Sequence, residues 1–310
     1  MSTISDIRVV STSLAVSVSD VVLNLLVALF TGSTVMLSQA LQGFSDLLTG
    51  GILFLGVRRS RREADSQYQF GYGREVFFWV LMAGIIMFLG TGAASVYLGY
   101  QQVVDPSAVS NVWLALAMLT FGFVTNGYSF SLSVRRLHRL HPGTSWARQL
   151  LRSSVVETKA TFLIDFLGTF AALIGLIALL IYSATGNPAF DGFGSIAIGL
   201  SMMFVAVLLV RDVRDLIVGK AVEPDVSARI TQAAQSIAGV NSVLDLRTMY
   251  LGSAKILVIL ELHMHDSLTT QQIEKISDNV KRVVQQNVPE VHHIQVEVET
   301  PDTDTIIAKK

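Results

Sequence analysis

Residues 35–57 read VMLSQALQGFSDLLTGGILFLGV, a mostly apolar run that ends at Arg58 and Arg59. A helix needs about 20 predominantly apolar residues to cross the hydrocarbon core of a bilayer. This stretch therefore predicts a membrane-spanning helix. It contains one carboxylate, Asp46, and an ionisable side chain at that depth is costly enough to indicate a functional role.

Five more stretches of the chain have the same length and character. With this one they predict six spans, at residues 9–32, 35–57, 76–100, 112–134, 161–182 and 190–210. The whole chain is 51% hydrophobic and 15% charged, and the charges are concentrated after the last span. We therefore expect an all-α transmembrane transport domain of six helices over residues 1–215. A cytosolic dimerisation or regulatory domain is expected over residues 216–310.

The loops between these spans differ sharply in charge. Arginine is frequent after spans two, four and six, at residues 58–74, 135–152 and 211–214, whereas the loops near Ser33, Asp105 and Asn187 contain no Lys or Arg. Basic loops face the cytosol, so both termini are predicted to be cytosolic. The N-terminal stretch lacks the features of a cleaved signal, and the short loops favour a cell (inner) membrane.

The C-terminal region has the periodicity of a small α/β domain. Apolar residues at helical spacing predict helices at 225–238 and 268–287, and alternation predicts strands at 242–249, 255–264 and 291–299. The resulting order, α-β-β-α-β, predicts an open-faced sandwich of the ferredoxin-like kind.

Polar side chains alternate along two of these strands and are predicted to share one face of the sheet. Imidazole and carboxylate groups suit divalent metals, so the face is a candidate cytosolic metal site. An ordinary solvated sheet face remains an equal alternative. The candidate ligands are Glu261, His263, His265, Glu297 and Glu299.

Three carboxylates lie well inside the predicted spans: Asp20, Asp46 and Asp165. No Lys or Arg stands at a matching depth to neutralise them, so a cation in transit or a proton is expected to do so. Asp20 is a candidate proton relay, although helix packing or a position in the cytosolic vestibule would also explain it.

Oxygen-bearing side chains accompany two of the carboxylates at helical spacing. Gln42 precedes Asp46 by four residues, and Thr161 precedes Asp165 by four, so each pair shares one helix face. The four side chains predict a metal transport site made of oxygen ligands. Gln42 and Thr161 would alternatively bond a neighbouring helix. Two unneutralised carboxylates repel, so metal entry would displace a proton.

Two further motifs resemble those of the cation diffusion facilitator family, which exports zinc and related divalent metals. Residues 70–75, FGYGRE, resemble the family signature that precedes span three, and residues 245–248, DLRT, resemble the start of its cytosolic domain. The resemblance implies a homodimer that exchanges cytosolic metal for protons by alternating access. It also implies that metal bound to the tail acts as a regulator.

The chain departs from the zinc type of that family. Zinc-type members usually carry His or Asp where Gln42 stands, and His where Thr161 stands, so the predicted site holds no imidazole. Zinc favours nitrogen and sulfur ligands, whereas oxygen sites favour Mn²⁺, Mg²⁺ or Fe²⁺. The predicted cargo is a divalent cation (Mn, Fe, Mg or Zn), with zinc not preferred. A regulatory partner without transport and a monovalent cation/proton antiporter remain alternatives.

Other classes of function find no support in the residues. There is no cysteine, so thiolate sites are excluded, and the net charge of −1 gives no basis for nucleic-acid binding. We find no nucleophile–base arrangement and no phosphate-binding glycine loop. We therefore expect neither an enzyme nor a cofactor, and the expected partners are a metal cation, protons, the lipid bilayer and a second copy.

Overall fold

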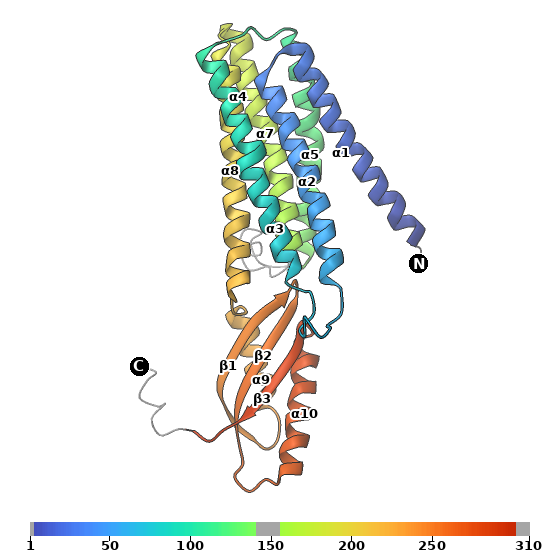
Figure 1. The fold of residues 1–310 in the computed structure, drawn as a ribbon, viewed down its shortest axis with the longest axis vertical. Helices are drawn as coiled ribbons and strands as arrows, with labels where there is room; N and C mark the ends of the chain where they lie inside the picture. Colours follow the sequence, from blue (N-terminus) through green and yellow to red (C-terminus); the bar gives the residue numbers. More distant parts are fainter. Residues whose placement is uncertain (1–2, 141–155, 302–310) are drawn as a thin grey trace. The chain divides into compact units, whose positions relative to one another are not determined.

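The computed structural model describes residues 3–140 and 156–301, which form two compact units. The first comprises residues 1–58 and 77–214, and the second comprises residues 59–76 and 215–310. The helices of the first unit run alternately up and down (Figure 1). They are α1 Thr3–Thr31, α2 Thr34–Ser60, α3 Glu75–Ile86, η1 Met87–Gly92, α4 Ala93–Val104, α5 Val112–Leu140, α7 Val156–Thr185 and α8 Ala189–Val218.

These helices have the composition of membrane spans. Within the described residues, five helical runs are long and apolar enough to cross a bilayer, and α1 adds the shorter apolar segment Ser17–Thr31. Large apolar side chains such as Leu29 and Trp113 are exposed, as expected of surfaces that face lipid. Together with the tail domain below, this confirms the predicted fold class. Arg148 and Arg152, part of the charge pattern that predicts orientation, lie outside the described residues.

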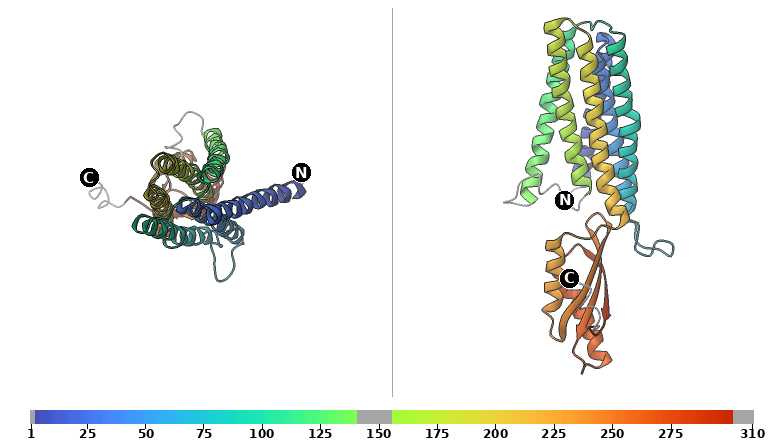
Figure 2. Two further views of the ribbon diagram at one scale, coloured as in Figure 1. Left: turned by 90° about the horizontal axis from the view of Figure 1, so that it is seen from above. Right: turned by 90° about the vertical axis from the view of Figure 1, so that its left-hand side faces the viewer.

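One buried carboxylate joins three helix ends. Asp191, in the first turn of α8, accepts hydrogen bonds from the Ser33 hydroxyl (2.5 Å), the Thr34 hydroxyl (2.8 Å) and the Thr34 backbone N–H (2.7 Å). The backbone N–H of Val35 also donates to it, at 3.1 Å. A carboxylate here satisfies orphan donors of the α2 N-terminus. The α1–α2 turn is thereby fixed to α8, whereas α1 diverges from the bundle towards its N-terminal end (Figures 1 and 2).

The third span is interrupted where uninterrupted helix was expected. Residues Met87–Gly92 form a π-helical segment, η1, between α3 and α4. A Cβ on Gly92 would lie 2.8 Å from the Met203 Cγ of α8, and a Cβ on Gly99 would lie 2.6 Å from the Gly192 carbonyl. Small residues thus let the two helices approach backbone to backbone, as is common in membrane bundles.

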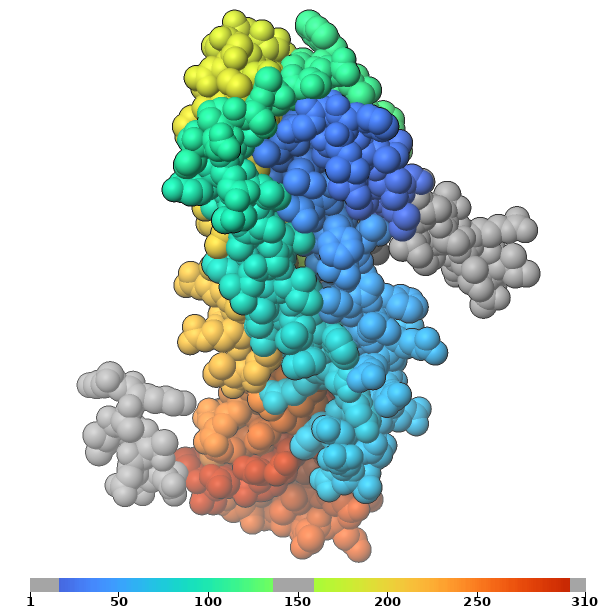
Figure 3. All heavy atoms as spheres, turned by 45° about the horizontal axis from the view of Figure 1, so that its top comes forward, coloured from blue at the N-terminus to red at the C-terminus, as the bar shows by residue number. Residues whose placement is uncertain are grey.

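Helix α2 also packs closely against α3. Gly56 of α2 faces Trp79 of α3, and a Cβ on Gly56 would lie 2.9 Å from the Trp79 Cβ. In the space-filling view, α2 (blue) and α3–α4 (teal) lie against each other along this face (Figure 3). The position of α2, which carries Gln42 and Asp46, is therefore set by close packing on both α3 and α8.

The second unit has the predicted order α-β-β-α-β. Its elements are α9 Pro224–Gln235, β1 Val240–Gly252, β2 Lys255–Met264, α10 Thr270–Asn287 and β3 Val291–Val298. The sheet order is β1-β2-β3, with β1 antiparallel and β3 parallel to β2. Leu260 and Leu262 are fully buried with Ile230 of α9 and Val284 of α10. The helices therefore cover one face of the sheet, and the other face carries Glu261.

The loop between α2 and α3 packs on the sheet within this unit, at the β1–β2 hairpin and at β3. The Phe70 and His293 rings meet edge to face, with their centroids 5.4 Å apart, and the Arg74 guanidinium lies 2.8 Å from the Met249 sulfur. Asp65 accepts hydrogen bonds from the Tyr72 hydroxyl (2.6 Å) and from the Tyr68 backbone N–H (2.7 Å). The Tyr72 bond contributes most to holding the pKa of Asp65 below its ordinary value. The FGYGRE motif thus forms an ordered docking loop.

Candidate functional site

A cavity of about 410 Å³ lies among α1, α2 and α5 in the first unit. It brings together Asp20 of α1 and Asp46 of α2, two of the three carboxylates predicted to matter. Gly43 makes this approach possible, because a Cβ there would lie 3.0 Å from Val21 of α1. Polar side chains stand among apolar surface in the cavity wall, which contains no Lys or Arg; the lining residues are Ser17, Ser19, Asp20, Leu23, Gly43, Asp46, Phe121, Thr125, Asn126 and Ser129.

The Asp46 carboxylate is only half satisfied. One oxygen, Oδ2, accepts a hydrogen bond from the Gln42 amide one turn earlier on the same helix. The other oxygen, Oδ1, is buried and has no hydrogen-bond partner in the described part of the chain. A buried acceptor of this kind costs free energy unless a donor or a cation satisfies it. Asp46 therefore offers a free oxygen for a cation.

The third carboxylate, Asp165, is held by a different helix. Its Oδ2 accepts a hydrogen bond from the Ser133 hydroxyl of α5, and the side chain is half-buried on α7. Asp165 and Asp20 both act electrostatically on the Asp46 carboxyl group. The three carboxylates therefore belong to one electrostatic cluster, although Asp165 is absent from the cavity wall.

Close packing sets Asp46 and Asp165 at comparable depths. Gly168 of α7 lies against Gln42 and Asn126: a Cβ there would be 3.0 Å from the Asn126 oxygen and 3.5 Å from the Gln42 nitrogen. Asp46 follows Gln42 by about one turn, and Asp165 precedes Gly168 by nearly one turn. Because α2 and α7 run in opposite directions, both carboxylates lie on the same side of this contact (Figure 1).

Thr161 differs from the other predicted ligands in burial. It lies one turn before Asp165 on α7 and is exposed, whereas Gln42 is 3% exposed. The structure thus brings Gln42 onto Asp46 directly, whereas Thr161 is absent from the wall of the cavity that holds Asp46.

Neutral polar residues of α5 complete the site, and the sequence analysis did not assign them. Thr125, Asn126 and Ser129 line the cavity, and Ser133 binds Asp165. Their spacing places them on one face of α5. That stripe of hydroxyl and amide groups in an apolar span was the available signal.

The polar face of the tail sheet is an ion-pair network. Asp245, Glu261 and Glu297 occupy paired positions on β1, β2 and β3. Arg247 lies 3.0 Å from the Asp245 carboxylate and 3.5 Å from that of Glu261, and the Asp245 hydrogen bond raises its pKa. Neighbouring carboxylates on a sheet repel, and here the guanidinium offsets that repulsion. Glu261 therefore already has a cationic partner.

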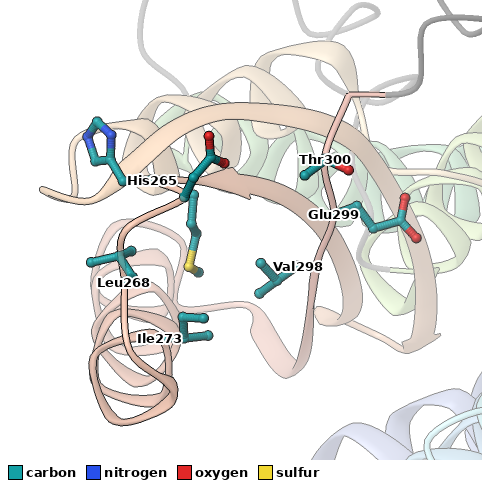
Figure 4. Close-up of a pocket in the computed structure, with 8 residues that line it drawn as sticks. His265, Leu268, Ile273, Val298, Glu299 and Thr300 are labelled. Carbon is teal, nitrogen blue, oxygen red and sulfur yellow. The ribbon is translucent and has the colours of Figure 1, made fainter.

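The tail histidines lie apart from one another. His263 faces the sheet surface on β2, 3.9 Å from Asp266. Strand β2 ends at Met264, so His265 lies in the following turn, and the alternation that predicted a shared face does not reach it. His265 and Glu299 stand at opposite edges of a hollow of about 530 Å³, which Leu268, Ile273 and Val298 line between them (Figure 4). In the described residues, no cluster of three or more His, Asp or Glu side chains could hold a metal.

Comparison with known proteins agrees with both units. A family model described as the cation efflux transmembrane domain matches residues 10–218, and one described as the cation efflux protein cytoplasmic domain matches residues 222–301.

Several curated proteins resemble the chain. The mouse mitochondrial proton-coupled zinc antiporter SLC30A9 is 24% identical over 230 residues, which are 74% of this chain and 41% of that protein. Metal tolerance protein C4 of Arabidopsis thaliana is 24% identical over 79% of this chain and 54% of its own length. Magnetosome protein MamB of Magnetospira sp. (strain QH-2) is 22% identical over 86% of both chains. The chain thus spans about half or less of the first two relatives.

Among solved structures, a nickel form of a MamM C-terminal-domain variant is 25% identical, with a TM-score of 0.25. It covers 26% of this chain and 100% of that one.

Proposed function

Because the chain belongs to the cation diffusion facilitator (cation efflux) family of membrane transporters, which are not enzymes, we propose that it exports divalent metal cations from the cytosol in exchange for protons. The cation would bind Asp46, Asp165, Gln42 and Thr161 during alternating access. The observation that carries this proposal is the half-satisfied Asp46 carboxylate, which stands in a cavity without Lys or Arg.

The carboxylate cluster supports coupling to protons. Asp20, Asp46 and Asp165 lie in an apolar bundle, where ionised carboxylates without a counter-ion are very costly. A bound metal cation or a set of protons can supply the missing charge, so that binding of one releases the other. Asp20, which shares the cavity with Asp46, is proposed to relay those protons. The name of the mouse relative, a proton-coupled antiporter, agrees with this exchange.

The chemistry of the donors supports a hard or borderline cargo ion. Gln42 and Thr161 can offer only neutral oxygens, and the described cavity contains no imidazole. Oxygen ligands suit Mn²⁺ and Mg²⁺ and serve Fe²⁺, whereas zinc sites favour nitrogen and sulfur. We therefore propose Mn²⁺, Fe²⁺ or Mg²⁺ ahead of Zn²⁺, although one of the relatives named above is a zinc antiporter.

The remaining parts of the proposal concern assembly and location. Residues 216–310 would serve as a cytosolic dimerisation and regulatory domain, consistent with the cytoplasmic-domain model, and residues 1–215 as the transport domain. The arginine-rich loops support a multi-pass protein of the cell membrane with both termini in the cytosol. The tail residues Glu261, His263, His265, Glu297 and Glu299 remain candidates for regulatory metal, and Glu261 would have to exchange Arg247 for the metal.

Flux measurements in proteoliposomes test the proposal. We would measure entry of Mn²⁺, Fe²⁺, Mg²⁺, Zn²⁺ and Na⁺ with and without a pH gradient, together with the pH of the lumen. Wild type is expected to move divalent cations and protons in opposite directions. Asp46→Asn and Asp165→Asn are expected to abolish that flux, because each removes a charge from the cluster. Asp105→Asn, in an exposed loop, is the matched control.

Four outcomes would contradict parts of this proposal. Unchanged flux in Asp46→Asn would exclude the site, and much faster flux of Zn²⁺ than of the other ions would exclude the assigned preference. Flux of Na⁺ alone would favour a monovalent antiporter, whereas absence of any flux from correctly folded protein would favour a regulatory partner.

A further inference from the structure

A second hollow lies on the outer surface of the bundle, away from the carboxylate cluster. It has a volume of about 430 Å³ and lies between α8 and the segment formed by α3 and η1. Its wall is almost entirely apolar, except at one end, where two arginines of α8 stand. The lining residues are Ile85, Phe88, Leu89, Ala206, Val207, Val210, Arg211 and Arg214.

Local packing explains why the hollow exists. Ala206 is fully buried and forms the floor of the hollow. Its small side chain leaves the space above it unfilled. Gly84 lets α3 approach α8 at one side: a Cβ on it would lie 2.8 Å from Val210. The π-helical segment η1 changes the helical register at Phe88 and Leu89, and such segments frequently occur at functional sites. The hollow is therefore built by the backbone of both helices.

The apolar wall faces outward. Leu89 is 67% exposed and Val207 is 49% exposed, and both belong to helices that are long and apolar enough to cross a membrane. Exposed apolar residues are expected there, so they do not by themselves indicate a partner. What distinguishes this surface is that a concave apolar wall ends beside two arginine side chains.

The two arginines share their stretch of α8 with two carboxylates, Asp212 and Asp215, but form no hydrogen bond or ion pair with either in the described part of the chain. Arg211 and Arg214 are both exposed, and neither has an ion-pair partner among the described residues. The nearby carboxylate of Asp212 is already paired with Lys159 at 3.1 Å. The two arginines are three residues apart on α8, so they share a face. This end of the hollow therefore attracts an anion with oxygen acceptors.

We propose that this groove binds one anionic phospholipid, with its phosphate at Arg211 and Arg214 and an acyl chain along the wall formed by η1 and α8. Guanidinium groups bind phosphate oxygens through charge-assisted hydrogen bonds. Basic pockets between membrane helices are established sites for anionic headgroups. Arginine at the end of an apolar span also places the phosphate at headgroup depth.

Charge argues for a lipid in place of a second copy as the occupant. Two copies in one membrane have parallel orientations, and a two-fold interface brings the same patch of each copy together. If the groove itself formed that interface, both arginine pairs would meet at the same depth. Like charges at an interface cost free energy, and an anionic lipid removes that cost.

The test measures lipid retention by the full-length protein. The protein is purified in detergent, incubated with mixed micelles of phosphatidylglycerol and phosphatidylcholine, washed, and its bound lipids are counted by mass spectrometry. Wild type is expected to retain phosphatidylglycerol selectively. In the double variant Arg211→Gln/Arg214→Gln, the amount of phosphatidylglycerol retained should fall about tenfold, because each basic group contributes to holding an anionic headgroup.

Two further variants separate the groove from general charge. Arg58→Gln/Arg135→Gln removes the same number of exposed arginines elsewhere and should retain lipid as wild type does. Val207→Trp fills the wall and should reduce retention while both arginines remain. Equal retention in wild type and Arg211→Gln/Arg214→Gln would overturn the proposal. So would an equal loss in the control variant.

Discussion

Gly73 and Gly252 meet backbone to backbone, although the loop of residues 59–76 is distant in sequence from the hairpin of β1 and β2. A Cβ on Gly252 would lie 2.9 Å from the Cα and the carbonyl oxygen of Gly73, and a Cβ on Gly73 would overlap the carbonyl oxygen of Leu251. The FGYGRE motif therefore requires glycine at this position because it docks on the hairpin.

Gly73→Ala is predicted to release the docking loop from the hairpin. The added methyl group meets backbone, which cannot move aside as a side chain can, so the cost should be roughly 1–3 kcal/mol. Limited trypsin digestion should cut at Arg61 and Arg62 much faster than in wild type, with a lower melting temperature. Gly50→Ala is the control, since no atom lies within 4 Å of a Cβ there. Equal cleavage rates in both variants would show that the contact is dispensable.

Asp191→Asn is predicted to loosen the α1–α2 turn. The carboxylate accepts four hydrogen bonds from Ser33, Thr34 and Val35. In the variant, an amide nitrogen replaces one of the two oxygens and cannot accept the hydrogen bonds made to that oxygen. Loss of a hydrogen bond to a charged group costs about 1.5–3 kcal/mol. A lower melting temperature of the detergent-solubilised protein is expected, with Asp105→Asn as the exposed control. A melting temperature equal to that of wild type would contradict this role.

Arg247→Gln is predicted to convert the sheet face into a better metal site. Without the guanidinium, Asp245, Glu261 and Glu297 form a row of neighbouring carboxylates across three strands, which repel each other and attract a divalent cation. A ligand that binds the folded state raises the melting temperature in proportion to its affinity. The variant should therefore melt lower than wild type without metal and gain more on addition of Mn²⁺ or Zn²⁺.

A matched control for that variant is Lys281→Gln, which removes an exposed cation paired with Asp278 on α10. It should leave the response to metal unchanged. If Arg247→Gln responds to metal no more than Lys281→Gln does, the carboxylates do not form a site. Adding Glu261→Gln to Arg247→Gln should cancel the gain.

Much of the fold could be predicted from the sequence, because apolar length and loop charge are local properties. Asp46 and Asp165 could be singled out because a carboxylate is rare in an apolar span. Ser133 and Asn126 could not, because a neutral polar side chain in a helix can equally bond its own backbone, as Ser131 does with Tyr128. What distinguishes Ser133 is the packing of α5 on α7.

Two other features depended on contacts between distant segments. Asp191 lies near the end of a span, where a carboxylate usually meets water, and its partners at Ser33–Val35 are far away in the sequence. His265 follows the alternation of β2, but the strand ends at Met264 because the chain turns at Asp266. Periodicity carries no information about where pairing with β1 stops.

Ser133→Ala is predicted to weaken cation binding without unfolding the bundle. The Ser133 hydroxyl donates to Asp165 across the α5–α7 contact and so fixes the orientation of a proposed ligand. A hydrogen bond to a charged group is worth about 1.5 kcal/mol or more, so the apparent affinity for the transported cation should fall about tenfold. Ser131→Ala is the matched control on the same helix, because that hydroxyl donates to the Tyr128 carbonyl and, within the described residues, to no carboxylate. Ser133→Thr keeps the hydroxyl and should restore affinity.

Since Ser133 acts by positioning Asp165, the KM for the cation should rise more in Ser133→Ala than the maximal rate falls. A fall in the maximal rate alone would instead assign Ser133 to a step after binding.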